Sequence, residues 1–224
     1  MKRYAAALFL FAAACASPPP PPPAPPPIPP LDPFPAVVAP IVQPVEVWSR
    51  EAGLLLRGPV PTRLPYLGMR LAVVQDAGDS LELRCVVCPG APVGWADRGR
   101  VIWVPQTPAD ARNGDLAEFV LAVRTAAVRR DSAALRMAMS RTFVHAHGGT
   151  EGVIPAVREL MSTRAQNLAR LPGLLDRGVA AVPGTRVWAA PPEYATTPNY
   201  PDLRAGFMRG EDGWEWIFLL RPGL

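Results

Sequence analysis

A run of prolines near the start of the chain limits where a folded domain can begin. The 224 residues include 30 prolines, and eleven of them lie between Pro18 and Pro30, interrupted only by Ala24 and Ile28. Proline has no backbone N–H and a fixed φ, so this run fits neither a helix interior nor a central strand. It adopts an extended polyproline II form that makes a spacer of about 40 Å. We expect residues 15–44 to be a linker. A docking motif for a proline-binding partner is the alternative.

Residues 1–14 have the features of an export signal. Two basic residues follow the first methionine, and then about eleven mostly apolar ones, too few for a membrane-spanning helix of about 20 residues. This pattern predicts a cleaved signal peptide. The segment Phe11–Cys15 resembles the bacterial lipobox, in which small residues precede a cysteine that becomes the acylated N-terminus. The resemblance implies lipidation of Cys15. Because Ala16 follows, it also implies an outer-membrane lipoprotein of a Gram-negative cell, facing the periplasm or the cell surface.

Ordinary signal peptidase offers an alternative at the same place. Ala14-Cys15-Ala16 also fits an A-x-A site, and cleavage after Ala16 would release a soluble protein. Acylation is favoured because a domain held on a lipid needs a spacer, and several acyl chains anchor firmly where one binds weakly. The predicted partners are then the membrane, through the N-terminal lipid, and either peptidoglycan or an envelope protein.

Charge argues against a nucleic-acid partner. The formal net charge is +4, lysine occurs only at Lys2, and the arginines are spread along the chain without a basic block. A nucleic-acid-binding domain gathers basic side chains on one face, often with aromatic ones. Residues 45–224 are enough for one large or two small domains with their own cores.

Cys85 and Cys88 form a C-x-x-C pair. An exported protein meets oxidising conditions, which favour a local disulfide. Redox motifs usually begin a helix, whereas the residues before Cys85 predict a strand that enters a Pro-Gly turn. A zinc site needs further ligands, and the sequence has no second C-x-x-C. Two free thiols, or a redox or metal role, are the alternatives.

Residues 45–106 have the pattern of an all-β domain, with short strands separated by glycine and proline. Three segments resemble the bacterial SH3-like (SH3b) family: Gly53–Pro59, Leu67–Leu71 and Gly94–Ala96. The resemblance implies a small barrel that binds peptides or the peptide stems of the cell wall. Trp95 is then either a binding platform or a core residue, and the core is favoured because burial of a large aromatic ring stabilises a small barrel.

Residues 110–224 change to helices followed by strands, an α+β plan. Residues from Leu116 to Ala127 are apolar at helical spacing, and a Gly-Glu-Asp-Gly turn predicts a final hairpin. Three segments resemble the nuclear transport factor 2-like (NTF2-like, SnoaL-like) family: Arg130–Leu135, Phe143–His145 and Gly149–Ile154. The resemblance implies a curved antiparallel sheet around a helix, with a cone that can hold a ligand.

Aromatic residues near the end of the chain are the candidate lining of this cone: Trp188, Tyr194, Tyr200 and Trp216. A filled core with aromatic rims is the alternative. His145 is the candidate polar contact, because it and His147 lie two apart on a predicted strand and point to one side. No third metal ligand stands at a suitable spacing, so we expect no metal and no cofactor.

The sequence therefore predicts an envelope lipoprotein that binds rather than catalyses. It contains neither a G-x-S-x-G elbow nor a phosphate-binding loop. We expect the first domain to bind peptidoglycan or a protein partner, and the second a small ligand or a partner. The alternative is an envelope enzyme, hydrolase or isomerase-like, that uses His145 with Asp131 or Glu151 in the cone. A purely structural lipoprotein of a larger envelope complex is a third possibility.

Overall fold

The computed structural model describes residues 45–103, 106–145, 152–197 and 199–221, which belong to a single compact unit. The predicted signal peptide, the lipidation site Cys15 and the linker lie outside these ranges, as do His147 and Glu151. Within them, no helix combines the length and the apolar character that crossing a membrane requires. The fold is a mixed α/β arrangement with a large, mostly antiparallel sheet.

The first part of the chain consists of short strands. They are β1 Glu46–Ser49, β2 Leu54–Leu56, β3 Thr62–Leu64, β4 Leu67–Asp76, β5 Ser80–Cys85, β6 Val93–Asp97 and β7 Val101–Ile102, with a 3-10 turn η1 at Arg98–Arg100. Apolar residues alternate along β5, where Leu81, Leu83 and Cys85 are buried. They join a core cluster with side chains of β1, β2, β3, β4 and β6. This alternation builds one buried face of the strand.

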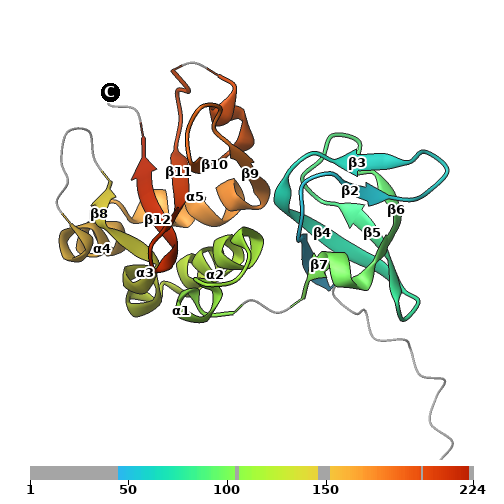
Figure 1. Ribbon diagram of the computed structural model, residues 1–224, viewed down its shortest axis with the longest axis horizontal. Helices are drawn as coiled ribbons and strands as arrows, with labels where there is room; N and C mark the ends of the chain where they lie inside the picture. The colour runs from blue at the N-terminus through green and yellow to red at the C-terminus, as the bar shows by residue number, and fades with distance from the viewer. Residues whose placement is uncertain (1–44, 104–105, 146–151, 198, 222–224) are drawn as a thin grey trace, which may run out of the picture. The chain divides into compact units, whose positions relative to one another are not determined.

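Helices and further strands follow. They are α1 Pro108–Ala111, α2 Leu116–Arg129, α3 Ser132–Ala138, β8 Met139–Val144, α4 Val153–Met161, α5 Ala165–Leu175, β9 Arg177–Ala181, β10 Val187–Ala190, η2 Pro192–Ala195, β11 Arg204–Gly210 and β12 Gly213–Leu220. Figure 1 shows the helices gathered around β8–β12. A second core cluster fills the space between them, where Phe119 meets Phe207 edge to face and Phe143 meets Trp216 in the same way.

Aspartate side chains fix where two of the helices begin. The carboxylate of Asp115 accepts a hydrogen bond from the backbone N–H of Glu118 and caps α2. Asp131 accepts hydrogen bonds from Ala133 N and Ala134 N and caps α3. Such caps satisfy N–H groups that have no partner within the helix and stabilise it by about 1 kcal/mol each. Between the two helices the chain reverses at Arg130, which adopts the left-handed conformation.

Strand β4 connects the two parts of the chain. Its first residues pair with β9, where Leu67 lies opposite Val179, and its later residues pair with β1 and β5. The resulting sheet has ten described strands. Eight of them follow the order β6-β5-β4-β9-β10-β11-β12-β8, and the other two branch from β4, because β1 pairs with β4 and β7 pairs with β1. Among the described strands, only β12 and β8 pair in parallel. The pairings among the described strands of residues 45–106 do not close a barrel, and β4 also pairs with β9 outside this range.

A buried carboxylate lies where β9 begins. Asp176 accepts hydrogen bonds from Trp48 Nε1 at 3.2 Å, from Arg70 Nη1 at 3.1 Å and from Arg124 Nε at 2.5 Å. Its side chain is only 6% exposed. Charges this deep in a protein are tolerated only when they are paired and hydrogen-bonded. The residues come from β1, β4 and α2, so Asp176 stabilises the association of the all-β part with the helical part.

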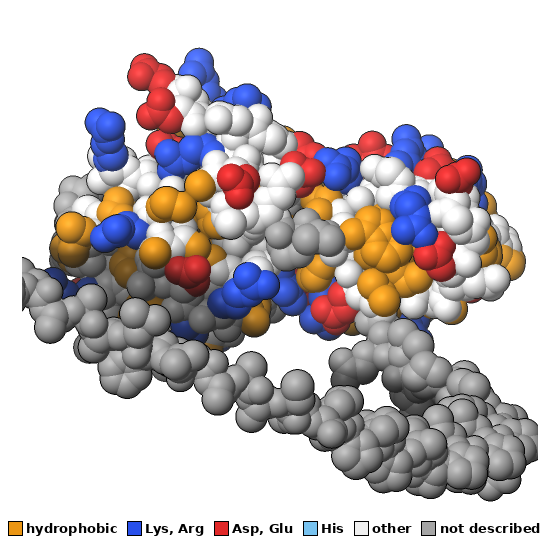
Figure 2. Space-filling model, turned by 90° about the horizontal axis from the view of Figure 1, so that it is seen from below, with side chains coloured by type: hydrophobic (Ala, Val, Ile, Leu, Met, Phe, Trp, Pro, Cys, Tyr) orange, Lys and Arg blue, Asp and Glu red, His pale blue; other side chains and the backbone are white. Residues whose placement is uncertain are grey.

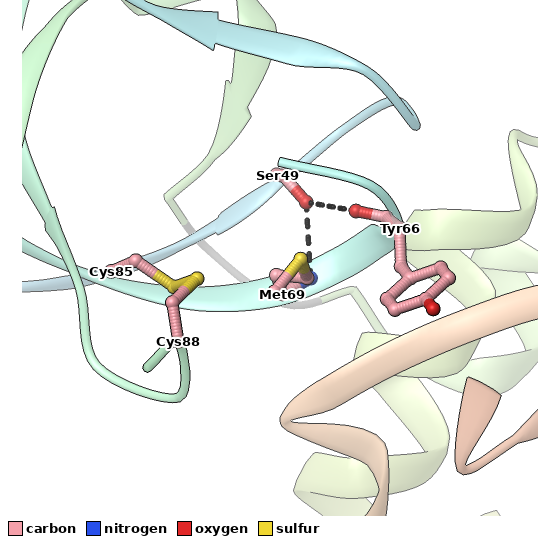
Figure 3. The surroundings of a disulfide bond; sticks show 5 residues. All are labelled: Ser49, Tyr66, Met69, Cys85 and Cys88. Atoms are coloured by element: carbon pink, nitrogen blue, oxygen red, sulfur yellow. Dashed lines mark hydrogen bonds between the residues drawn. A yellow bond between two sulfur atoms is a disulfide. The ribbon is translucent and has the colours of Figure 1, made fainter. Parts of the chain in front are cut away.

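Cys85 and Cys88 are joined by a disulfide at the end of β5. Cys85 is buried in the core cluster of the all-β part, and Cys88 is half-buried against it. Figure 3 shows the bond beside Met69 and the buried hydroxyl of Ser49. That hydroxyl donates to the carbonyl oxygen of Tyr66 and accepts from the backbone N–H of Met69, so it holds β1 against β4.

Candidate functional site

Helices α3 and α4 present an outward strip of side chains beside one another. On α3, Leu135 and Ala138 are buried, whereas Ala133 and Arg136 lie on the exposed side. On α4, Ala156 and Leu160 are buried, while Ile154 and Arg158 face outward at a spacing of four. Residues four apart lie on one face of a helix, so each helix contributes both an apolar and a basic side chain to the strip.

Between these outward side chains lies an open groove of about 380 Å³, which we term the α3–α4 groove. It is lined by Ser132, Ala133, Arg136, Ile154, Val157, Arg158 and Met161. This volume lies at the lower end of the range of about 300–1,000 Å³ that ligand sites occupy. The groove is open, since Ile154 is 63% exposed and the neighbouring Met137 is 47% exposed. Figure 2 shows, on one face of the helical region, hydrophobic side chains exposed among basic ones.

The groove carries positive charge that the described part of the chain does not neutralise. Within that part, neither Arg136 nor Arg158 forms an ion pair or a side-chain hydrogen bond. Among the described residues that line the groove there is no aspartate or glutamate. Neither arginine stands out in the sequence, because a basic residue on an amphipathic helix usually faces only solvent. The signal that identifies them is the juxtaposition of two helices, which no single helix reveals.

A second hollow, of about 280 Å³, lies beside α5 and includes Tyr200. Its two arginines already have partners: Arg170 Nη2 donates to Asp202 at 2.6 Å, and Arg177 forms an ion pair with Glu193. The hydrogen bonds from Arg170 and from the backbone N–H of Leu203 hold the pKa of Asp202 below its usual range. The charges of this hollow are balanced within the chain, so it attracts a charged ligand less than the α3–α4 groove does.

His145 follows directly after β8, and its side chain is fully buried. Its Nε2 lies 3.1 Å from Oε2 of Glu159, and the same oxygen accepts a hydrogen bond from Arg164 Nε at 2.8 Å. Arg164 also donates to the carbonyl oxygen of His145. Among the described residues, the carboxylate beside His145 is that of Glu159 on α4, which no local sequence signal indicates because it comes from another element. The predicted partner Asp131 instead caps α3.

This histidine cluster lacks the properties of an open catalytic site. A buried imidazole cannot reach a substrate in solution without a movement of the chain. Among the described residues, no group of three or more His, Cys, Asp or Glu side chains could hold a metal ion. The arrangement connects β8 to α4 and to the start of α5.

The four aromatic candidates for a cone lie on two faces of the sheet. Trp216 is fully buried in the core on the helix side, and Trp188 is packed against that core. Tyr194 and Tyr200 contact one another edge to face on the opposite side, where Tyr194 also meets Phe218. Phe218 covers Gly206, whose neighbour Phe207 points to the core. The four rings therefore do not line one common cavity.

Trp95 lies on the outward face of β6. Its neighbours Gly94 and Ala96 are buried, whereas Trp95 is half-buried and absent from the core clusters. Its strand pairs with β5 so that Trp95 lies opposite Glu82, and a bridge connects it to Arg57. The ring is thus available at the surface beside charged side chains.

No protein-family model matches this chain, and no curated protein or solved structure matches it either.

Proposed function

We propose that this chain is a cell-envelope binding protein that holds a partner in the α3–α4 groove. The observation that carries the proposal is the pair of arginines, Arg136 and Arg158, beside exposed apolar side chains and without an ionic partner among the described residues. Exposed apolar surface of this kind is typical of interaction sites. The protein acts by binding and positioning, not by catalysis.

The finer assignments rest on the sequence. The lipobox-like segment supports a lipid anchor on Cys15, and the proline-rich linker would let the folded part reach away from the membrane. The outward Trp95 is consistent with an SH3-like part that binds peptidoglycan or a protein partner. The order of helices before antiparallel strands supports the NTF2-like resemblance of the second part. A palmitate label that is lost in Cys15→Ser would support the anchor, and a label that survives would contradict it.

The groove is tested by photo-crosslinking of the full chain in its own cells. A photoreactive benzoylphenylalanine replaces Ile154, which is 63% exposed in the groove, or Val60, which is 76% exposed in the all-β part. We expect a discrete adduct from position 154 and none from position 60. Absence of any adduct at position 154, with normal protein levels, overturns the proposal.

An envelope enzyme is the second candidate, and the pairing of His145 with Glu159 is the observation in its favour. In this hypothesis Glu159 takes the role expected of Asp131 or Glu151. The comparison of His145→Ala with wild type in thermal unfolding tests it. If the variant is clearly destabilised, the histidine is structural. If it folds with unchanged stability and the wild-type protein retains a stoichiometric metal after purification, the enzyme hypothesis gains.

A further inference from the structure

We infer that the α3–α4 groove takes an acidic, amphipathic polypeptide segment, which docks as a helix. This inference rests on the proposed function and names the class of partner. Two features of the groove carry it: an apolar base between two helices, and basic side chains without acidic ones among the described lining residues.

The shape of the groove favours a polypeptide over a small ligand. Small-molecule sites bury most of their ligand's surface, whereas this groove is open along the helices, with Ile154 largely exposed. Two neighbouring helices leave a groove between them, and the apolar face of a third helix can pack into it. The apolar side chains that hold such a helix in place recur at spacings of three and four residues. Ala133, Val157 and Met161 provide the apolar contact surface for these anchors.

The charge of the groove favours acidic residues in the partner. Arg136 belongs to α3 and Arg158 to α4, so basic groups lie on both helices that border the apolar base. In the described part of the chain neither has an acidic partner, and each presents a planar guanidinium that can bind a carboxylate through two hydrogen bonds. Glutamate or aspartate residues beside the apolar anchors would complement both. Because these charges are exposed, added salt should weaken the binding.

The test uses the full-length protein in nanodiscs of neutral lipid and two labelled synthetic peptides. The first is an amphipathic helix of leucine, alanine and glutamate, and the second has glutamine in place of every glutamate. We expect fluorescence anisotropy to show that the acidic peptide binds about tenfold more tightly than the glutamine peptide, with an advantage that shrinks at high salt. The double variant Arg136→Gln, Arg158→Gln should lose this preference.

Matched variants separate the groove from general effects of charge. Arg186→Gln removes an exposed arginine in the turn before β10 and should leave the binding unchanged. Ile154→Ser should weaken the binding of both peptides, whereas Val60→Ser should not. Equal affinity for the two peptides, or an equal effect of Arg186→Gln, overturns the inference.

Other occupants give distinct outcomes. Vesicles that contain phosphatidylglycerol would displace the acidic peptide if the groove held anionic lipid, and this would overturn the inference. A change of oligomeric state in the double arginine variant would indicate a second copy of the chain and would also overturn it. An adduct at position 154 in cells, together with peptides that fail to bind, would leave the proposed function standing and remove only the acidic partner.

Discussion

The indole N–H of Trp48 donates a hydrogen bond of 3.2 Å to the carboxylate of Asp176, across 128 positions of the sequence. The guanidinium of Arg124 lies 4.9 Å from the centre of the Trp48 ring and binds the same carboxylate. Arg70 adds a third donor. One buried acid thus joins β1 to α2, so the two parts should unfold together.

Asp176→Asn should be strongly destabilising. The amide keeps the shape but removes the negative charge, and Arg124, whose side chain is only 14% exposed, is then left without its counter-charge. Removal of one partner of a buried ion pair costs about 3–5 kcal/mol. Urea unfolding, followed by tryptophan fluorescence and by far-ultraviolet circular dichroism, measures the loss. We also expect coincident transitions by both probes in the wild-type protein.

The control for this variant is Asp97→Asn. Asp97 pairs with Arg57 at the surface, where both side chains are 55% exposed. Such pairs contribute at most about 1 kcal/mol. If the two variants lost equal free energy of unfolding, the burial of Asp176 would add nothing to the stabilisation by its ion pairs.

Gly206→Ala tests the outer face of the sheet. A Cβ atom at this position would lie 2.2 Å from the ring of Phe218, so the ring would have to move. Phe218 is packed edge to face on Tyr194, and its displacement would disturb that contact. Overpacking of this kind costs about 1–3 kcal/mol. Thermal unfolding should show the loss, whereas Gly99→Ala, with open space around it, should change little.

Low pH should remove the contribution that the ionised Asp202 makes to the free energy of unfolding. Its hydrogen bonds with Arg170 and the backbone of Leu203 lower its pKa in the folded state, so the folded protein binds this proton less readily than the unfolded chain. The stabilisation is therefore present above about pH 4 and is lost as the pH falls through the lowered pKa. Urea unfolding of the wild type and of Asp202→Asn should differ by at most about 1 kcal/mol at neutral pH, because the pair is exposed. The difference should vanish near pH 2, and a constant difference would contradict this explanation.

Trp95→Ala separates surface binding from core packing. The half-buried ring lies on the outward face of β6, so we expect its truncation to cost less than that of the fully buried Trp216. Trp216→Ala should cost about 3–5 kcal/mol. If the SH3-like part binds the cell wall, Trp95→Ala should reduce co-sedimentation with purified peptidoglycan severalfold, while Val60→Ser should not. An unchanged pellet fraction would exclude Trp95 from that contact.

Local sequence signals predicted much of the secondary structure. The apolar spacing from Leu116 predicts a helix, and α2 occupies it. Aspartate is a favoured residue at the start of a helix, and Asp131 caps α3. The Gly-Glu-Asp-Gly turn joins β11 to β12. These features depend on residues a few positions apart, and such short-range rules can be read directly from a chain.

Contacts between distant segments could not be predicted in the same way. Nothing near Leu67 indicates that β4 pairs with β9, more than 100 residues later. Asp176 is a lone acid without a motif, and Glu159 meets His145 only because α4 packs beside β8. The α3–α4 groove likewise exists only once two helices lie together, since Arg136 and Arg158 appear in the sequence as ordinary solvent-facing residues.

The position of β1 in the sheet has a mechanical consequence. The described fold begins at this strand, which is hydrogen-bonded to β4 on one side and to β7 on the other. A pull on the chain ahead of Val45, with the other end held by cargo at α3 and α4, would load these main-chain bonds before any helix. The force that the fold withstands would then depend on the hydrogen bonds of β1, which has only four residues, and on the packing of Trp48 in that strand.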